Sequence, residues 1–196
     1  MRVILFATLA LTAAVQVNAQ PPAQKATELV LEDQFDRKAD LADLRGQVVI
    51  LVYGDRKATD LCKTVGESLH VCWHPEAKGQ PPAKAQAAPV VPLENLKPGQ
   101  VSPNVVVVPV ACCGKVPGPI QKPIRSQIAK ASPDAVVWLD FGNTMKTMFG
   151  QTAGEPNLAV FDAAGQLRFK FNGTPDQVTM EQLAKTVQEL RVEAVR

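Results

Sequence analysis

The sequence lacks an excess of charge of either sign. Its 196 residues include 21 Lys and Arg against 19 Asp and Glu, a formal net charge of +2. A nucleic-acid-binding domain normally carries a pronounced basic surface, so the charge balance excludes that class and predicts no nucleic-acid partner. The N-terminal apolar run is also too short to span a bilayer comfortably. We therefore expect no integral membrane segment in the mature chain.

That N-terminal run, from Val3 to Val15, follows Arg2 and precedes Val17-Asn18-Ala19. A positive start, an apolar segment and a small-residue cleavage site together are typical of a secretory signal peptide. We expect residues 1–19 to be removed and the mature protein to be exported, to the periplasm or out of the cell. Disulfides persist in such compartments. An uncleaved anchor or a buried N-terminal helix is the alternative.

Beyond the leader, strand and helix patterns alternate. The continuous apolar run at 48–53 is typical of a strand buried on both faces of a sheet. The order of elements predicts an α/β fold with a mixed sheet and helices on both faces. Strands are expected at 28–31, 48–53, 105–111, 135–141, 157–161 and 167–171, and helices at 58–69, 120–130, 143–149 and along the C-terminal stretch.

The segment 75–103 differs in composition from the rest of the chain. Nine of its 29 residues are Gly or Pro, five are Ala and none is aromatic. Such a segment buries too little apolar surface to order itself. We expect an extended insertion on the surface of one domain that spans residues 20–196. A Pro-rich ligand for a partner is the alternative.

Two segments resemble the thioredoxin superfamily, in its peroxiredoxin and redoxin branch. Asp43 to Leu51 is similar to that family's loop, glycine and strand, and Glu155 to Gly165 is similar to its proline, strand and turn. The resemblance covers about residues 28–192, interrupted by the segment 75–103. It implies a three-layer α/β/α thioredoxin-like fold that ends in a β-hairpin and a helix, with a cis-proline at Pro156. We expect no cofactor.

The residues that carry this family's chemistry are missing. In the family, a thiol lies at the first turn of the helix after the strand 48–53, where the helix N-terminus stabilises a thiolate. Counted from that strand, the two cysteines of the thioredoxin motif would fall at Lys57 and Asp60. An anion site made by Arg56 and Lys57 is one interpretation of this turn. An ordinary solvated helix start is the other.

The four cysteines lie elsewhere in the sequence. Cys62 falls in the first helix, Cys72 falls just after it, and Cys112 and Cys113 end the strand 105–111. Functional groups of open α/β sheets gather at the carboxyl ends of the strands, so we expect the thiols in one neighbourhood. Four cysteines allow three complete pairings. A bridge within the adjacent pair is disfavoured by its Cα separation of about 3.8 Å, which favours bridges to Cys62 or Cys72.

Pro109 conflicts with the strand predicted at 105–111. Proline lacks the N–H that a strand inside a sheet donates to its neighbour. We therefore expect the strand to end near Val108 or to contain a bulge, either of which would move Cys112 and Cys113.

The two histidines of the chain both flank Cys72, as His70-Val71-Cys72-Trp73-His74. In extended backbone His70, Cys72 and His74 project to one side. With another cysteine they could hold zinc or copper. Exposed loop histidines beside a disulfide are the alternative.

Three functions follow from these observations. The first is an exported thiol–disulfide oxidoreductase with a displaced site, in which Cys112 and Cys113 act with Cys62 or Cys72 on a protein or peptide partner. The second is a redox-inactive module with structural disulfides that binds a peptide or protein at the face of Glu155 and Pro156. Metal binding is the third. Fold alone does not decide between them.

Overall fold

The computed structural model describes residues 27–196, so the predicted signal peptide lies outside the described residues. Within this range no helix is both long and apolar enough to cross a membrane. The strands are β1 (Val30–Asp33), β2 (Lys38–Asp40), β3 (Val48–Gly54), β4 (Val105–Cys112), β5 (Trp138–Asp140), β6 (Asn157–Phe161) and β7 (Leu167–Asn172). The helices are α1 (Thr59–Trp73), α2 (Pro82–Gln86), α3 (Gly118–Ala131), α4 (Thr144–Phe149) and α5 (Gln177–Glu193), with 3-10 turns η1 (Leu41–Leu44), η2 (Arg56–Ala58) and η3 (Pro75–Ala77).

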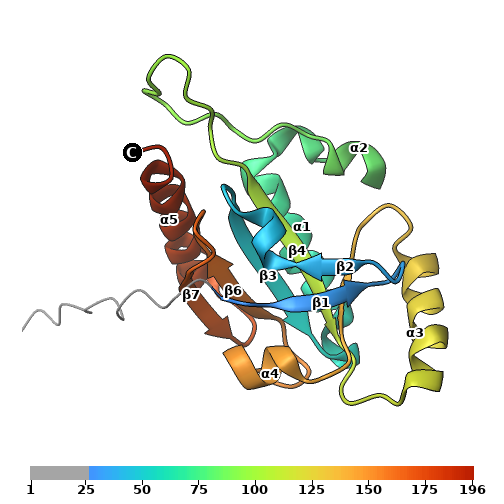
Figure 1. Cartoon of the computed structure of the whole chain (residues 1–196). Helices are drawn as coiled ribbons and strands as arrows, with labels where there is room; N and C mark the ends of the chain where they lie inside the picture. The colour runs from blue at the N-terminus through green and yellow to red at the C-terminus, as the bar shows by residue number, and fades with distance from the viewer. Residues whose placement is uncertain (1–26) are drawn as a thin grey trace, which may run out of the picture.

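The strands form one mixed sheet in the order β2-β1-β5-β4-β3-β6-β7 (Figure 1). β3 and β4 are parallel, in register from Val48 opposite Val105 to Gly54 opposite Ala111. β5 continues the parallel part, whereas β6 and β7 add an antiparallel hairpin on the other side of β3. The mixed sheet, the hairpin and the final helix confirm the predicted α/β architecture.

Strand β3 lies inside the sheet, between β4 and β6, and every one of its residues is buried. Successive side chains of a strand point to opposite faces, so each half of this apolar run supplies a different core. Val48, Ile50 and Val52 pack with apolar residues of α1 and α5. Val49, Leu51 and Tyr53 pack on the other face with α4 and the N-terminal segment. This double burial explains why the run shows no polar alternation.

The structure corrects two of the expected boundaries. Helix α1 continues to Trp73, so Cys72 lies within the helix rather than after it. Strand β4 continues through Pro109, which pairs with Val52 without a register shift. β5 pairs with β4 only from Val110 onward, so Pro109 has a neighbouring strand on one side alone. The missing N–H therefore costs no bond to β5, and neither the early strand end nor the bulge is found.

The segment 75–103 contains η3, α2 and several turns. Ala77 and Leu93 are buried, so the segment orders more than its composition predicts. Its backbone is held by donors from outside it. The Val91 carbonyl and the Pro103 carbonyl accept hydrogen bonds from Arg191 of α5. That the segment is an insertion stays a prediction.

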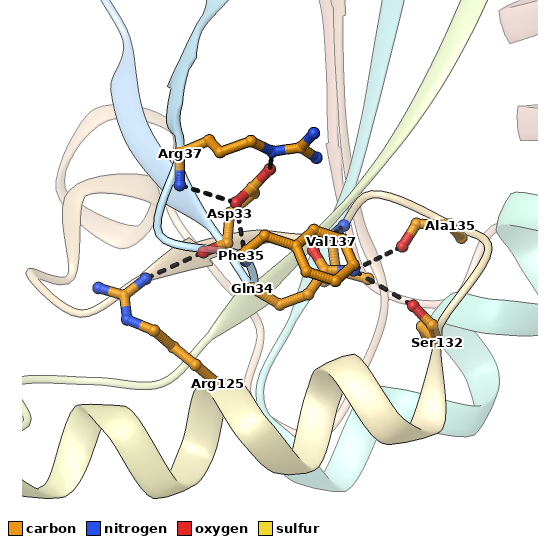
Figure 2. A network of polar contacts seen from close by, with 8 residues as sticks. All are labelled: Asp33, Gln34, Phe35, Arg37, Arg125, Ser132, Ala135 and Val137. Atoms are coloured by element: carbon orange, nitrogen blue, oxygen red, sulfur yellow. Dashed lines mark hydrogen bonds and ion pairs between the residues drawn. The ribbon is translucent and has the colours of Figure 1, made fainter.

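The β1–β2 hairpin is fixed to α3 and β5 by a polar network (Figure 2). Gln34 is buried and donates to the carbonyls of Ser132 and Ala135, while its own side-chain oxygen accepts from the Val137 N–H. Arg125 of α3 is 7% exposed and donates to the Asp33 carbonyl at 3.0 Å. Its guanidinium also forms ion pairs with the side chains of Glu32 and Asp36.

Replacing Arg125 with Ala should lower the free energy of unfolding by about 2 kcal/mol, measured by urea denaturation. The substitution leaves the Asp33 carbonyl without its buried donor, which costs about 1–3 kcal/mol. Glu32 and Asp36 are exposed, so they regain water and add little. Lys38→Ala is the matched control, because it breaks an exposed ion pair with Asp40 worth less than about 1 kcal/mol. Equal losses in both variants would contradict the prediction.

Candidate functional site

The turn between β3 and α1 is organised by the carboxylate of Asp55. Its Oδ1 atom accepts hydrogen bonds from the backbone N–H groups of Lys57 at 2.9 Å and Ala58 at 3.2 Å. Aspartate in this position satisfies the free N–H groups of a starting helix. Lys57 and Asp60, at the positions expected for the two motif cysteines, are exposed. The donors that would otherwise meet a thiolate or an external anion are therefore used within the chain.

The same carboxylate joins this turn to the loop that precedes β6. Oδ2 of Asp55 accepts from the Gly154 N–H at 2.9 Å. Glu155 in that loop accepts from the Thr174 N–H at 2.7 Å through its Oε2 atom. Pro156 is buried. Glu155 thus bonds to its own chain, and the buried proline offers little surface to a partner at the face predicted for peptide contacts.

The cis-proline implied by the resemblance is a wrong prediction for Pro156. No described residue has a cis peptide bond. Pro156 is followed by Asn157, whose Nδ2 donates to the carbonyls of Glu155 and Tyr53. The Asn157 side chain thereby fixes the loop on both sides of Pro156 while the bond keeps the trans form that most X–Pro bonds adopt.

Under this loop lies a fully bonded polar layer. Asn157 is 0% exposed and also bonds to both backbone groups of Thr152. The Tyr53 hydroxyl donates to the Gly150 carbonyl at 2.9 Å and lies 3.0 Å from Oδ1 of Asn172. No buried side-chain nitrogen or oxygen of the described residues lacks a partner. Such complete pairing rigidifies a structure, so this side of the site is closed.

Three cysteines gather beside the closed turn, at the carboxyl ends of β3 and β4. Cys62 lies in α1 so close to β3 that a Cβ added to Gly54 would be 2.7 Å from its Sγ. Gly54 pairs with Ala111, and Cys112 follows in β4. Cys62 is near enough to Cys112 to contribute, after burial, Asp140 and Cys113, to the raised pKa of Cys112. Cys62, Cys112 and Cys113 thus lie at the same end of the sheet as partly buried free thiols, but Cys62 packs on the α1 face and Cys112 on the opposite face, so their joint action stays a prediction.

The surroundings of these thiols oppose ionisation. Burial, and then the Asp55 carboxylate, raise the pKa of Cys62 to about 11. Burial and the Asp140 carboxylate raise the pKa of Cys113 to about 11, against a smaller opposite effect of Arg125. The pKa of Cys112 is raised further by burial and by Asp140. Because a thiolate is the reactive form, these groups are weak nucleophiles at neutral pH.

Asp140 is the buried carboxylate of this cluster. It ends β5 opposite Cys112 and is 0% exposed. Its two oxygens accept the N–H groups of Gly142, Thr144 and Met145 at 2.8–3.0 Å. These bonds satisfy the side chain at the start of α4, and within residues 27–196 no cationic side chain forms an ion pair with it. The carboxylate therefore stabilises the helix start and destabilises nearby thiolates.

Cys72 lies outside the cluster, contrary to the expected gathering of all four thiols. It is exposed, near the end of α1. Ten residues of α-helix separate it from Cys62, or about 15 Å along the axis. A bridge from Cys72 to Cys112 or Cys113 is equally remote, because His74 beside it contacts Val105 at the opposite end of β4.

The three residues proposed as weak metal ligands do not converge. Since α1 extends to Trp73, His70 and His74 lie one turn apart and their rings stack with centroids 4.4 Å apart. Helical backbone directs Cys72 away from that side. Among residues 27–196 no group of three His, Cys, Asp or Glu side chains has an arrangement that could hold a metal ion. The extended backbone assumed for these ligands is wrong, and metal binding is not supported.

Asp55, Asp140 and Gly54 were missed as parts of the site. Asp55 precedes a predicted helix, which is the usual signature of a helix cap, so its role could have been found. Asp140 bonds to residues two, four and five positions later, but its nearness to Cys112 depends on strand pairing. The close approach of α1 to Gly54 is a tertiary contact without a sequence signal.

The sheet order, the covering helices and the position of this site define the thioredoxin-like class of fold. No family model matches the chain, and no curated protein matches it. Several solved structures have a similar fold. A DsbF homologue from Corynebacterium diphtheriae matches at 14% identity and a TM-score of 0.52, over 93% of this chain and 99% of that chain.

Two further structures lead to the same conclusion. The exposed lipoprotein thioredoxin of Streptococcus pneumoniae matches at 15% identity and a TM-score of 0.51, over 81% of this chain and 98% of that one. A thiol:disulfide interchange protein of the thioredoxin family from Chlorobium tepidum matches at 14% and 0.51, over 87% and 99%. At such identities the likeness concerns the fold, which is thioredoxin-like as the sequence predicted.

Gly54→Ala should lower the free energy of unfolding by about 2 kcal/mol. The added Cβ would lie 2.7 Å from Cys62 Sγ and 2.8 Å from Ala58 Cβ, and overpacking of this kind costs about 1–3 kcal/mol. Gly66→Ala is the control within α1, since a Cβ there meets nothing within 4 Å. It should stabilise the protein by about 0.5–1 kcal/mol. Urea denaturation of both variants tests the tight contact, which a neutral Gly54→Ala would disprove.

The thiols of Cys62, Cys112 and Cys113 should react slowly with iodoacetamide at pH 8. Their rates should be at least about tenfold lower in the folded protein than in urea. An unperturbed thiol has a pKa near 8.5 and is partly ionised at pH 8, whereas Cys62 and Cys113, with pKa values of about 11, are not. The folded rate should rise with pH between 8 and 10, because the thiolate fraction rises. Peptide mapping of the alkylated cysteines measures each site. Equal rates in folded and unfolded protein would contradict these pKa directions.

Proposed function

We propose that this protein is a thiol–disulfide protein whose exchanging cysteines are displaced from the β3–α1 turn to Cys62 and Cys112. The support for the proposal is that α1 and the end of β4 converge at one end of the sheet, where Cys62 acts on the pKa of Cys112, although the two thiols pack against opposite faces of the sheet. The sheet end is the one at which ligands of open α/β sheets gather. Cys113 follows as a third thiol in the same neighbourhood, with Arg125 of α3 acting on its pKa.

The exchange has two steps. The thiolate of one cysteine attacks a disulfide sulfur of a protein partner, forms a mixed disulfide and releases one partner thiolate, which takes up a proton. The thiolate of the second cysteine then attacks the mixed disulfide, so that Cys62 and Cys112 become a disulfide and the second partner thiol leaves. Two electrons pass to the partner. Because burial and carboxylates oppose thiolate formation at each site, the exchange is slow at neutral pH.

The opposite assignment is a redox-inactive module in which Cys62 and Cys112 form a structural disulfide. Two observations favour it. Asp55 holds the helix start that usually activates a thiol, and no thiol of the cluster has a lowered pKa. A structural disulfide resists reduction, with a potential below about −300 mV. This second function predicts a locked bridge instead of turnover.

We further propose that the protein acts outside the cytoplasm. The support is the signal-peptide pattern of residues 1–19. One protein with a similar fold is described as an exposed lipoprotein thioredoxin. In an oxidising compartment the Cys62–Cys112 pair would be oxidised on arrival unless a donor reduces it. The partner of the reducing reaction is thus a protein disulfide, and a thiol donor must restore the dithiol.

An insulin-reduction assay with dithiothreitol separates the two functions. Under the first, the mature chain accelerates insulin precipitation, and Cys62→Ser and Cys112→Ser each lower the rate at least about tenfold. The reason is that removing the attacking sulfur prevents the mixed disulfide from forming, and removing the second sulfur prevents its resolution within the protein. Activity should also rise from pH 7 to pH 9, since the thiolate fraction of Cys62 rises toward its pKa of about 11.

Cys72→Ser is the matched control. Cys72 is exposed and lies at the far end of α1, so its loss should leave the rate within about twofold of wild type. A loss as large as that of Cys62→Ser would refute the assigned pair. No turnover, together with a Cys62–Cys112 bridge found by mass spectrometry that dithiothreitol does not open, would establish the structural role instead.

A further inference from the structure

His74 is a buried histidine with two acceptors and no solvent contact of note. It follows α1 directly and is 3% exposed. Its Nδ1 lies 2.9 Å from the carbonyl oxygen of Ala88, and its Nε2 lies 2.9 Å from the carbonyl oxygen of Val105. Ala88 belongs to the segment 75–103, and Val105 begins β4. The ring therefore joins that segment to the central sheet.

Both hydrogen bonds form only when the ring is an imidazolium. A carbonyl oxygen accepts and never donates, and a neutral imidazole has one N–H whereas an imidazolium has two. In the neutral ring one nitrogen lone pair would face a carbonyl oxygen in a site that water scarcely reaches. The loss of one buried hydrogen bond is costly because the stranded groups find no other partner.

We propose that His74 is a pH-sensitive latch, which docks residues 85–91 on the protein when it is protonated and releases them when it loses its proton. The docked backbone depends on few other bonds. The Val91 N–H donates to the Trp73 carbonyl at 2.8 Å, and His70 Nε2 lies 2.9 Å from the Ala85 carbonyl. All of these partners lie at the end of α1, so loss of one contact weakens the rest.

The charged groups around His74 determine which partners can stabilise its protonated ring. The His70 ring stacks on the His74 ring with centroids 4.4 Å apart. His70 faces one carbonyl acceptor, that of Ala85, so one N–H on its ring satisfies the contact. Glu76 of η3 and Lys84 of α2 line the hollow next to Ala88, and Arg191 of α5 donates to the Val91 carbonyl. Lys78 directly follows η3, and the first residues of β4 are uncharged valines. No ion pair joins His70 or His74 to a carboxylate of the described chain.

The direction of the pH effect follows from proton linkage. The docked state binds the His74 proton through two acceptors, whereas the released state exposes the ring to water. Docking is therefore favoured at acidic pH and weakens as pH rises and the ring loses its proton. Export into a compartment of variable pH would expose the latch to such changes.

Amide hydrogen exchange of the mature protein tests the latch. The Val91 amide reports docking directly, because its bond to Trp73 joins the segment to α1. Its protection factor, corrected for the intrinsic pH dependence of exchange, should fall about tenfold between pH 5.5 and pH 8.5. His74→Gln retains a donor but does not titrate, so its Val91 protection should not change with pH.

His70→Gln is the matched control, since the substitution removes a titrating ring with a single acceptor. This variant should keep the tenfold change of wild type. A change that persists in His74→Gln, disappears in His70→Gln or is absent from wild type would overturn the proposal. If His74→Gln does not fold, ring nitrogen chemical shifts of wild type decide. At pH 5.5 the His74 ring should show two protonated nitrogens, and a neutral ring there would overturn the latch.

Discussion

Seven residues of β3 pair in parallel with seven residues of β4, and this register places the features at both ends of the sheet. At the carboxyl ends it places Cys112, on one face of the sheet, at the same end as Cys62 of α1 on the other face. At the amino ends the register places Val105 beside the C-terminal end of α1. His74 therefore reaches the first carbonyl of β4. A shift of one residue would turn the β4 side chains to the other face and place a different backbone carbonyl opposite His74. The thiol cluster and the histidine contact thus depend on the same set of backbone bonds.

At the start of α1 the Asp55 carboxylate occupies the position expected for a thiolate. A helix N-terminus stabilises a thiolate or a carboxylate by the same free N–H groups and the same dipole. Asp55 uses two of these groups and a third from Gly154, which closes the loop against the turn. The thiols lie beyond this position, so they receive burial and the fields of Asp55 and Asp140 without the benefit of the dipole. Their pKa values rise for that reason. The electrostatics favour neutral thiols or a disulfide over a reactive thiolate.

The sequence predicted the parts of the molecule that depend on local pattern. The run 48–53 indicated the central strand because both of its faces are buried, and the pattern 157–171 indicated the hairpin. The end of α1 was missed, although Leu69 and Trp73 continue a spacing of four residues and pack in the same core. The spacing of His70, Cys72 and His74 indicated an extended backbone there instead. The trans bond at Pro156 and the ordering of 75–103 could not be predicted, because they depend on contacts between residues distant in sequence. Asn157 bonds to Tyr53 beside the loop, and His74 bonds to Val105 while Arg191 bonds to Val91 and Pro103 at the segment.

That segment illustrates how a chain poor in apolar residues can be held on a surface. Its carbonyls accept from cationic donors, and hydrogen bonds from charged groups are stronger than those between neutral groups. Arg191 is 1% exposed and donates to the carbonyls of Pro103 and Val91. A guanidinium keeps its proton at every physiological pH, so the end of the segment stays anchored to α5. His74 differs because its two carbonyl contacts both form only while the ring carries a second proton. The two anchors therefore divide the segment into a permanently held end and a middle part whose attachment depends on pH. Release would then extend no further than the Val91 N–H, because Arg191 holds the Val91 carbonyl, and the connection to β4 and the sheet register would stay intact.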